Sequence, residues 1–183
     1  MAVRLEQIVT LRDGRRVQLR LARGADAESM AAFRAEVAGE GRFFGGADDL
    51  KRLATRIRAT IPSADSLDAL ELLALHDDVL VGDLWFGRRE EALARHCAEV
   101  YMALATTARG VGLGSAMMRA ALRWGRIQHI EKVEGAVRAG NDGVRALLRK
   151  FGFREEGRRR DHYKTQTGEY EDEILYALWL IRH

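Results

Sequence analysis

The chain has 183 residues, 47% hydrophobic and 31% charged, a length that suits one globular domain with a single packed core. Thirty Lys and Arg residues against 27 Asp and Glu residues give a formal charge of only +3, and basic residues alternate with acidic ones. Because no run of about eighteen apolar residues occurs, a transmembrane helix is not expected, and the composition also argues against disorder.

The single cysteine and the N-terminus narrow the class further. Cys97 alone can form neither an intramolecular disulfide nor a cysteine-rich metal site. Residues 1–10 carry Arg4 and Glu6 and lack the apolar core of a secretory signal. We therefore expect a cytoplasmic protein that binds no metal, no membrane and no nucleic acid.

The N-terminal part of the chain predicts a hairpin followed by two helices. Residues 3–23 alternate apolar and polar side chains on either side of Asp13-Gly14, which is typical of a β-hairpin. Asp26 can cap a helix whose apolar residues recur at helical spacing, namely Met30, Phe33 and Val37. A second helix before Pro62 has an apolar face of Leu50, Leu53, Ala54 and Ile57.

The middle of the chain changes to the period of strands. Apolar runs at residues 70–75 and 79–86 predict two neighbouring strands. A third strand is expected over residues 97–106, with Val100, Met102 and Leu104 on one face and Glu99, Tyr101 and Ala103 on the other. A glycine-rich turn then leads into a helix with the apolar residues Leu113, Met117, Ala121 and Trp124.

The C-terminal part predicts a strand at residues 133–137, a helix at 144–151, and final strands near 156–163 and 174–181. Strands alternate with helices here, whereas hairpins dominate the first half. We therefore expect one α/β (α+β) domain over residues 1–183, with a twisted, mostly antiparallel mixed sheet flanked by helices.

The strongest local signal is the segment 109–115, RGVGLGS, between the third strand and its helix. Glycines let the backbone turn sharply and approach a ligand. The helix N-terminus adds unpaired N–H groups and the positive end of the helix dipole. Such a turn is suited to phosphate, and Arg109 adds a positive charge at its entrance.

Several phosphate-binding motifs compete for this turn. A Walker loop ends in Gly-Lys-Ser/Thr, which is absent here. The dinucleotide fingerprint G-x-G-x-x-G fails because its third glycine falls one residue early, at Gly114, although Glu134 lies about twenty residues downstream as that motif requires. A purely structural glycine turn is a further alternative.

Three motifs, in this order, resemble those of the GCN5-related N-acetyltransferase (GNAT) superfamily. Arg109, Gly112 and Gly114 match the Q/R-x-x-G-x-G/A pattern of its acyl-CoA pyrophosphate loop. The segment 141–153, NDGVRALLRKFGF, is similar to its block that ends in K-x-G-F. Residues 156–160 (EGRRR) and 168–173 (GEYEDE) are similar to the tail of bacterial members.

The resemblance implies that acetyl-CoA is the acyl donor and that residues 96–153 form the cofactor-binding half. The backbone of Met102 to Leu104 is expected to pair with the pantetheine arm, and Asn141 to contact the same arm or to cap the following helix. The pyrophosphate is expected to lie on Arg109, Gly110, Val111, Gly112, Leu113, Gly114 and Ser115.

The resemblance also directs attention to proton transfer, because the attacking amine must be neutral. Glu99 lies close to where protein-acetylating members carry their base, and His96 is an alternative. Many members protonate the CoA thiolate with a Tyr where this chain has Leu148. Tyr163 is the best substitute acid, with a structural role as its alternative.

The acceptor pocket is expected in the loop between the first two helices, at Glu40, Arg42, Phe43 and Phe44, although core packing is the default for the two phenylalanines. The predicted activity is transfer of an acetyl group to a primary amine of a small molecule or peptide. A non-catalytic acyl-CoA sensor is the alternative, for which Leu148 is the encouraging feature. The last two strands could pair two copies into a homodimer.

Overall fold

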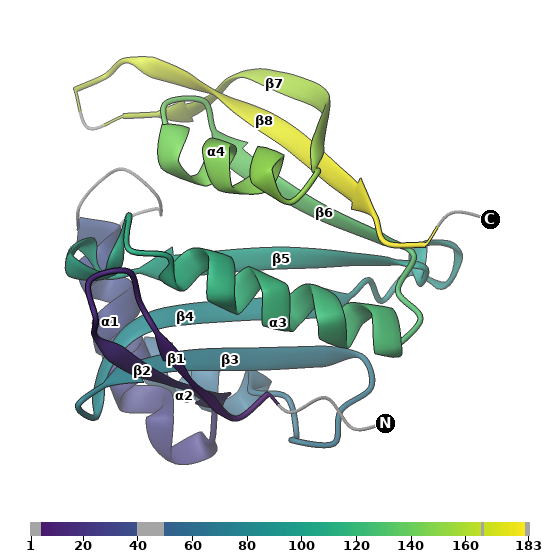
Figure 1. Ribbon diagram of the computed structural model, residues 1–183. Helices are drawn as coiled ribbons and strands as arrows, with labels where there is room; N and C mark the ends of the chain where they lie inside the picture. The colour runs from purple at the N-terminus through teal and green to yellow at the C-terminus, as the bar shows by residue number, and fades with distance from the viewer. Residues whose placement is uncertain (1–4, 40–49, 166, 182–183) are drawn as a thin grey trace.

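Eight strands form one mixed sheet in the order β1-β2-β3-β4-β5-β6-β8-β7 (Figure 1) in the computed structural model, which describes residues 5–39, 50–165 and 167–181. The strands are β1 (Gln7–Thr10), β2 (Arg16–Leu21), β3 (Ala69–His76), β4 (Val79–Arg88), β5 (Cys97–Leu104), β6 (Lys132–Arg138), β7 (Arg154–Lys164) and β8 (Tyr170–Trp179). The described helices are α1 (Ala27–Gly39), α2 (Leu50–Thr60), α3 (Leu113–Ile127) and α4 (Asp142–Lys150). None of these four is long and apolar enough to cross a membrane.

Strand directions confirm the predicted fold class. Neighbouring strands are antiparallel throughout the sheet except for β5 and β6, which run parallel. Helix α3 makes the crossover between these two strands, as a parallel connection requires. The one parallel pair therefore lies inside an otherwise antiparallel sheet, away from both edge strands.

Helices cover both faces of the sheet. Because successive strand residues point to opposite faces, Leu72 and Leu73 of β3 enter different apolar clusters. Leu72 packs in the main core, to which α3 contributes Leu113, Met117, Ala121 and Trp124. Leu73 packs with Met30 of α1 and Ile57 of α2 on the other face. Figure 1 shows α3 and α4 on one side and α1 and α2 behind the β2–β4 part of the sheet.

The two hairpins expected in the first half are present. Strands β1 and β2 pair with Val9 opposite Val17. Strands β3 and β4 are joined at Asp77 and Asp78, whose φ angles of 48° and 62° are left-handed. Two consecutive left-handed residues form the turn type whose twist matches a tight hairpin, and Asp tolerates this conformation.

Several predicted boundaries differ from the structure. Strand β5 ends at Leu104 because residues 106–108 form a 3-10 turn. Strands β7 and β8 begin earlier than expected, since β7 is mostly exposed and polar and is defined by its pairing with β8 rather than by an apolar pattern. The carboxylate of Asp26 accepts from the Arg23 N–H and the Arg20 guanidinium, both at 2.7 Å, and so joins the hairpin to the start of α1.

Two carboxyl groups are buried under α1. Glu71 of β3 and Asp83 of β4 both contact the guanidinium of Arg34, at 3.0 and 2.6 Å. Asp83 Oδ1 is buried without a hydrogen-bond partner among the described residues. Burial, and then the charge of Asp83, raise the pKa of Glu71 to about 9. A protonated Glu71 can donate to Asp83 and satisfy that oxygen.

We expect Glu71→Gln to flatten the pH dependence of stability. The folded-state pKa of Glu71 is raised above its ordinary 4.5, so the protonated carboxyl contributes stability that is full below pH 4.5 and is lost as pH rises toward about 9. One such proton gives a slope of at most about 1.4 kcal/mol per pH unit. An amide keeps the donor and cannot ionise.

Urea unfolding of the parent and of Glu71→Gln between pH 5 and pH 9 measures this difference. The exposed Glu36 on α1 offers a matched control, because Glu36→Gln should retain the slope of the parent. Parallel stability curves for the parent and Glu71→Gln would show that Glu71 is ionised in the folded state.

Candidate functional site

Strands β5 and β6 separate from one another part of the way along their length. Their pairing is limited to residues 97–99 of β5 and 132–134 of β6, whereas β5 continues to Leu104 and β6 to Arg138 (Figure 1). A cavity of about 1670 Å³ lies at this opening and is lined by β5, β6, the glycine loop, α4 and the β7–β8 hairpin. Because none of the described strands pairs with β5 here on its β6 side, the backbone of residues 100–104 offers hydrogen bonds to an extended ligand.

The glycine loop lies at the end of this cavity that is farthest along β5 from the paired residues 97–99, which we call the wide end. Gly110 and Gly112 have φ angles of +74° and +99°, which favour glycine, and Gly112 directly precedes α3. A Cβ at Gly114 would lie 3.2 Å from a Leu104 methyl group and 3.3 Å from one of Leu147. The first two glycines therefore shape the turn, whereas Gly114 permits close packing of α3 on β5 and α4.

The remaining predicted loop residues have distinct positions. Leu113 is fully buried in the core, so only its backbone can face a ligand. Val111 accepts a hydrogen bond through its carbonyl from the Arg12 N–H at 3.0 Å. The guanidinium of Arg109 donates twice to the Leu104 carbonyl, at 3.0 and 2.8 Å, and thereby attaches the loop to the end of β5.

Helix α4 supplies further polar groups to the wide end. The Asn141 carboxamide oxygen accepts from the Val144 N–H at 3.2 Å, so Asn141 caps this helix while also lining the cavity. Lys150 at the other end of α4 donates to Ser115 Oγ at 3.0 Å. Lys150 was not among the predicted site residues, although its place in the K-x-G-F block is a signal. Leu148 is buried in the core and has no acidic group to offer.

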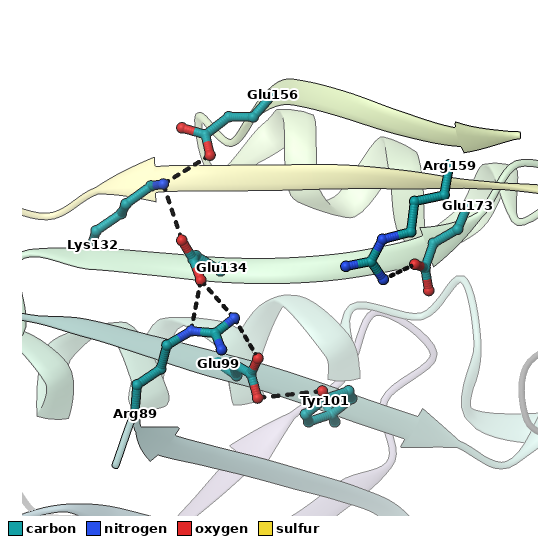
Figure 2. A network of polar contacts seen from close by, with 8 residues as sticks. All are labelled: Arg89, Glu99, Tyr101, Lys132, Glu134, Glu156, Arg159 and Glu173. Atoms are coloured by element: carbon teal, nitrogen blue, oxygen red, sulfur yellow. Dashed lines mark hydrogen bonds and ion pairs between the residues drawn. The ribbon is translucent and has the colours of Figure 1, made fainter. Parts of the chain in front are cut away.

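Glu99 lies at the closed end, where β5 and β6 begin to separate. Figure 2 shows Arg89 between two carboxylates, at 2.6 Å from Glu99 and 2.9 Å from Glu134. The Tyr101 hydroxyl donates to the second oxygen of Glu99 at 3.4 Å. The Glu99 side chain is 31% exposed and lines the cavity, so it remains accessible to a ligand.

The ion pairs of this end continue along the sheet. Lys132 contacts Glu134 at 3.0 Å and Glu156 at 2.8 Å (Figure 2). Burial favours a higher pKa for Glu134, but hydrogen bonds from Lys132 and Arg89 outweigh it and lower that pKa. Burial and the charge of Glu99 raise the pKa of Tyr101, which therefore stays protonated.

Tyr163 lines the same cavity from β7. Its hydroxyl donates to Glu173 at 2.5 Å, and Glu173 is opposite Arg138 at the far end of β6. Glu173 is buried and is also paired with Arg159 at 2.6 Å (Figure 2). Burial and Glu173 raise the pKa of Tyr163 to about 12. The structure thus places Tyr163 and Glu99 on the wall of one cavity, from β7 and β5 respectively.

The remaining predicted residues are those of the acceptor pocket and the alternative base. The acceptor residues Glu40, Arg42, Phe43 and Phe44 lie outside the described residues. His96, the alternative base, stacks on Trp179 at 6.4 Å between ring centres. Within the described ranges, no group of three or more His, Cys, Asp or Glu residues could hold a metal ion.

Comparisons with known proteins show which family of domains this chain resembles. The family model of the acetyltransferase (GNAT) domain matches residues 16–154. A search of curated protein sequences finds no significant match.

Several solved structures share the fold. An acetyltransferase of the GNAT family from Streptococcus pneumoniae aligns with a TM-score of 0.79 at 21% identity, over 89% of this chain and 99% of that one. A putative acetyltransferase from Salmonella typhimurium, solved with its cofactor acetyl-CoA, aligns with a TM-score of 0.77 at 17% identity, over 91% of this chain and 95% of that one. The ribosomal-protein-alanine N-acetyltransferase from Brucella melitensis aligns with a TM-score of 0.72 at 23% identity, over 88% of this chain and 98% of that one.

Proposed function

Because the chain belongs to the GNAT acetyltransferase family, we propose that it transfers an acetyl group from acetyl-CoA directly to a primary amine of a small molecule or peptide. The observation that carries the proposal is the opening between β5 and β6, which joins an unpaired strand edge to a glycine loop at the N-terminus of α3. An extended arm fits the strand edge, and phosphates fit the loop. The residues present therefore suit acetyl-CoA.

The donor is expected to bind with its phosphates at the wide end and its acyl group toward the closed end. Residues 109–115 come shortly after Leu104, where β5 ends, so phosphates bound to the loop would lie at that end of β5. Backbone groups of Met102 to Leu104 would orient the arm along β5. When bound, acetyl-CoA supplies a thioester carbonyl that a neutral amine can attack.

Glu99 is the proposed general base. Its carboxylate lies where β5 and β6 meet and can accept the proton that the acceptor amine loses. The amine nitrogen then forms a bond to the acyl carbon, the carbon–sulfur bond breaks, and the thiolate leaves. Tyr101 beside Glu99 holds the carboxylate in place through its hydroxyl.

We propose Tyr163 as a minor proton donor to the leaving thiolate. Its pKa of about 12 keeps the hydroxyl protonated, but the proton is held by Glu173. A thiol has an ordinary pKa near about 8.5, so the thiolate leaves without much help from an acid at neutral pH. Tyr163→Phe should therefore reduce turnover by less than about tenfold, compared with the larger factors typical of an essential acid.

Steady-state release of CoA thiol by Tyr163→Phe measures this effect. Glu173→Gln is the matched variant, because it keeps the tyrosine and replaces its charged acceptor with a neutral amide oxygen. A hundredfold or larger loss confined to Tyr163→Phe would instead make Tyr163 the essential proton donor.

Two measurements test the proposed function itself. Calorimetry should show saturable binding of acetyl-CoA, and a panel of amines screened by CoA-thiol release should reveal acceptors. A chain that does not bind acetyl-CoA would contradict the proposal. Binding without release across the panel would favour the second candidate, a non-catalytic acyl-CoA sensor, which the apolar Leu148 supports.

We also propose a cytoplasmic homodimer of single-domain chains. Strand β7 is an exposed, eleven-residue edge strand, and Tyr170 and Trp179 of β8 expose 61% and 40% of their surfaces. Such an edge can pair with a second copy. Sedimentation at micromolar concentration should show a dimer, and a monomer would contradict this proposal.

A further inference from the structure

The tip of the β1–β2 hairpin lies against the glycine loop, although the two segments are far apart in the sequence. The Arg12 N–H donates to the Val111 carbonyl at 3.0 Å. The Arg15 guanidinium donates to the Thr107 carbonyl at 2.7 Å, and Asp13 orients that guanidinium at 2.6 Å. These contacts fix the hairpin tip relative to the loop.

This arrangement places the Arg12 side chain over the residue that precedes α3. A Cβ on Gly112 would lie 3.8 Å from Arg12 Cγ and 4.0 Å from its Nε. Arg12 lines the same cavity as Gly110 and Ser115. In the described part of the chain Arg12 pairs with no carboxylate, whereas Arg15 is paired with Asp13.

The charges around the loop suggest what Arg12 binds. Arg109 directs its guanidinium to the Leu104 carbonyl, and Lys150 donates to Ser115. Arg12 adds a third cation at the mouth, on the side of the hairpin. A guanidinium binds phosphate oxygens through two parallel hydrogen bonds, and Arg is preferred where this geometry is needed.

We infer that Arg12 binds a phosphoryl group of the acyl-CoA donor, which makes the N-terminal hairpin part of the donor site. This inference rests on the proposed function. Coenzyme A has a pyrophosphate and a 3′-phosphate, and either can supply the oxygens. The reacting acyl group lies toward the opposite end of the cavity, so Arg12 acts on donor binding and not on the chemical step.

Binding of CoA and of 3′-dephospho-CoA to the full chain tests this role. Arg12→Ala should weaken CoA binding about tenfold. This is near the smallest loss expected for a hydrogen bond between charged groups, because solvent and salt screen an exposed site. Arg16→Ala is the matched control, since Arg16 is an exposed arginine of the same hairpin that does not line the cavity. Arg12→Lys keeps the charge but not the two parallel hydrogen bonds, so it should recover only part of the affinity.

The possible outcomes distinguish the pyrophosphate from the 3′-phosphate, and failure of this inference from failure of the proposed function. Equal losses for both ligands identify the pyrophosphate, and a loss for CoA alone identifies the 3′-phosphate. If the parent binds CoA but Arg12→Ala matches Arg16→Ala, the inference is overturned while the proposed function stands. A parent that binds neither ligand overturns both. Equal losses in Arg12→Ala and Arg12→Lys with lowered melting temperatures would overturn it in favour of hairpin packing.

Discussion

Glu99→Gln should lower turnover by about 10²–10⁴-fold at neutral pH, the usual range for loss of a general base. Its affinity for acetyl-CoA should stay nearly unchanged, because the phosphate loop lies at the other end of the opening. The substitution keeps the size of the side chain and a hydrogen-bond acceptor for Tyr101, but it removes the group that takes the proton. Single-turnover rates with a saturating acceptor, together with calorimetry of acetyl-CoA, separate the two quantities.

The defect of Glu99→Gln should narrow as pH rises. An acceptor amine with an ordinary pKa near about 10.4 is mostly protonated at neutral pH, and a more basic solution supplies more of the neutral form without help from the enzyme. The ratio of parent to variant turnover measured from pH 7 to pH 10 should therefore fall. A constant ratio would mean that Glu99 positions the acceptor and does not take its proton.

Glu134→Gln is the control for disruption of the ion-pair network. Arg89 contacts both Glu99 and Glu134, so each substitution removes one of its partners. Only Glu99→Gln removes the proposed base. If both variants turn over within about threefold of the parent, a factor worth about 0.65 kcal/mol, the proton leaves by another route.

The part of the site that could be predicted is encoded locally. Glycines 110, 112 and 114 follow a strand and precede an amphipathic helix, and each of these signals is contained in a few neighbouring residues. The left-handed angles of Gly110 and Gly112 and the start of α3 at Leu113 follow from that short segment. The alternation of β5, with Glu99 and Tyr101 on the face opposite Val100, is local in the same way.

The contacts that complete the site depend on strand order, which the local pattern does not contain. Arg12 reaches Gly112 because the first hairpin folds against the loop, and Arg89 reaches Glu99 and Glu134 across the sheet. Glu173 belongs to a recognised tail motif, yet its contact with Tyr163 follows from the pairing of β7 with β8. Nothing in the spacing of these residues indicates such contacts.

The buried pair of carboxyl groups could not be predicted from the apolar strands. Residues 70–75 and 79–86 are predicted as strands from their apolar character, and both runs contain one carboxylate, at Glu71 and Asp83. Their burial together depends on Arg34 of α1, which lies over that face of the sheet. A charged residue inside an apolar run is thus explained only when the helix above it is placed.

Gly110→Asp should weaken acetyl-CoA binding by about 10²-fold, because it places a carboxylate beside the expected pyrophosphate. Two unit charges at about 4 Å near a protein surface interact by about 4 kcal/mol, and solvent around the exposed loop reduces this repulsion. Gly110 is the most suitable position for this test, because a side chain there does not collide with its neighbours. A Cβ there would meet nothing within 4 Å, whereas one at Gly114 would crowd Leu104 and Leu147.

Gly110→Asn separates charge from backbone strain. Asp and Asn have the same shape and both tolerate left-handed backbone, such as the φ of +74° at this residue, better than other side chains do. Both variants should therefore melt at similar temperatures, and Gly110→Asn should retain acetyl-CoA affinity to within about tenfold, since a neutral amide adds no like-charge repulsion. Raising the salt concentration should reduce the gap between the two variants, because the repulsion is screened. If Asp and Asn weaken binding equally, the loop fails through its conformation, and the negative charge of the donor does not lie beside Gly110.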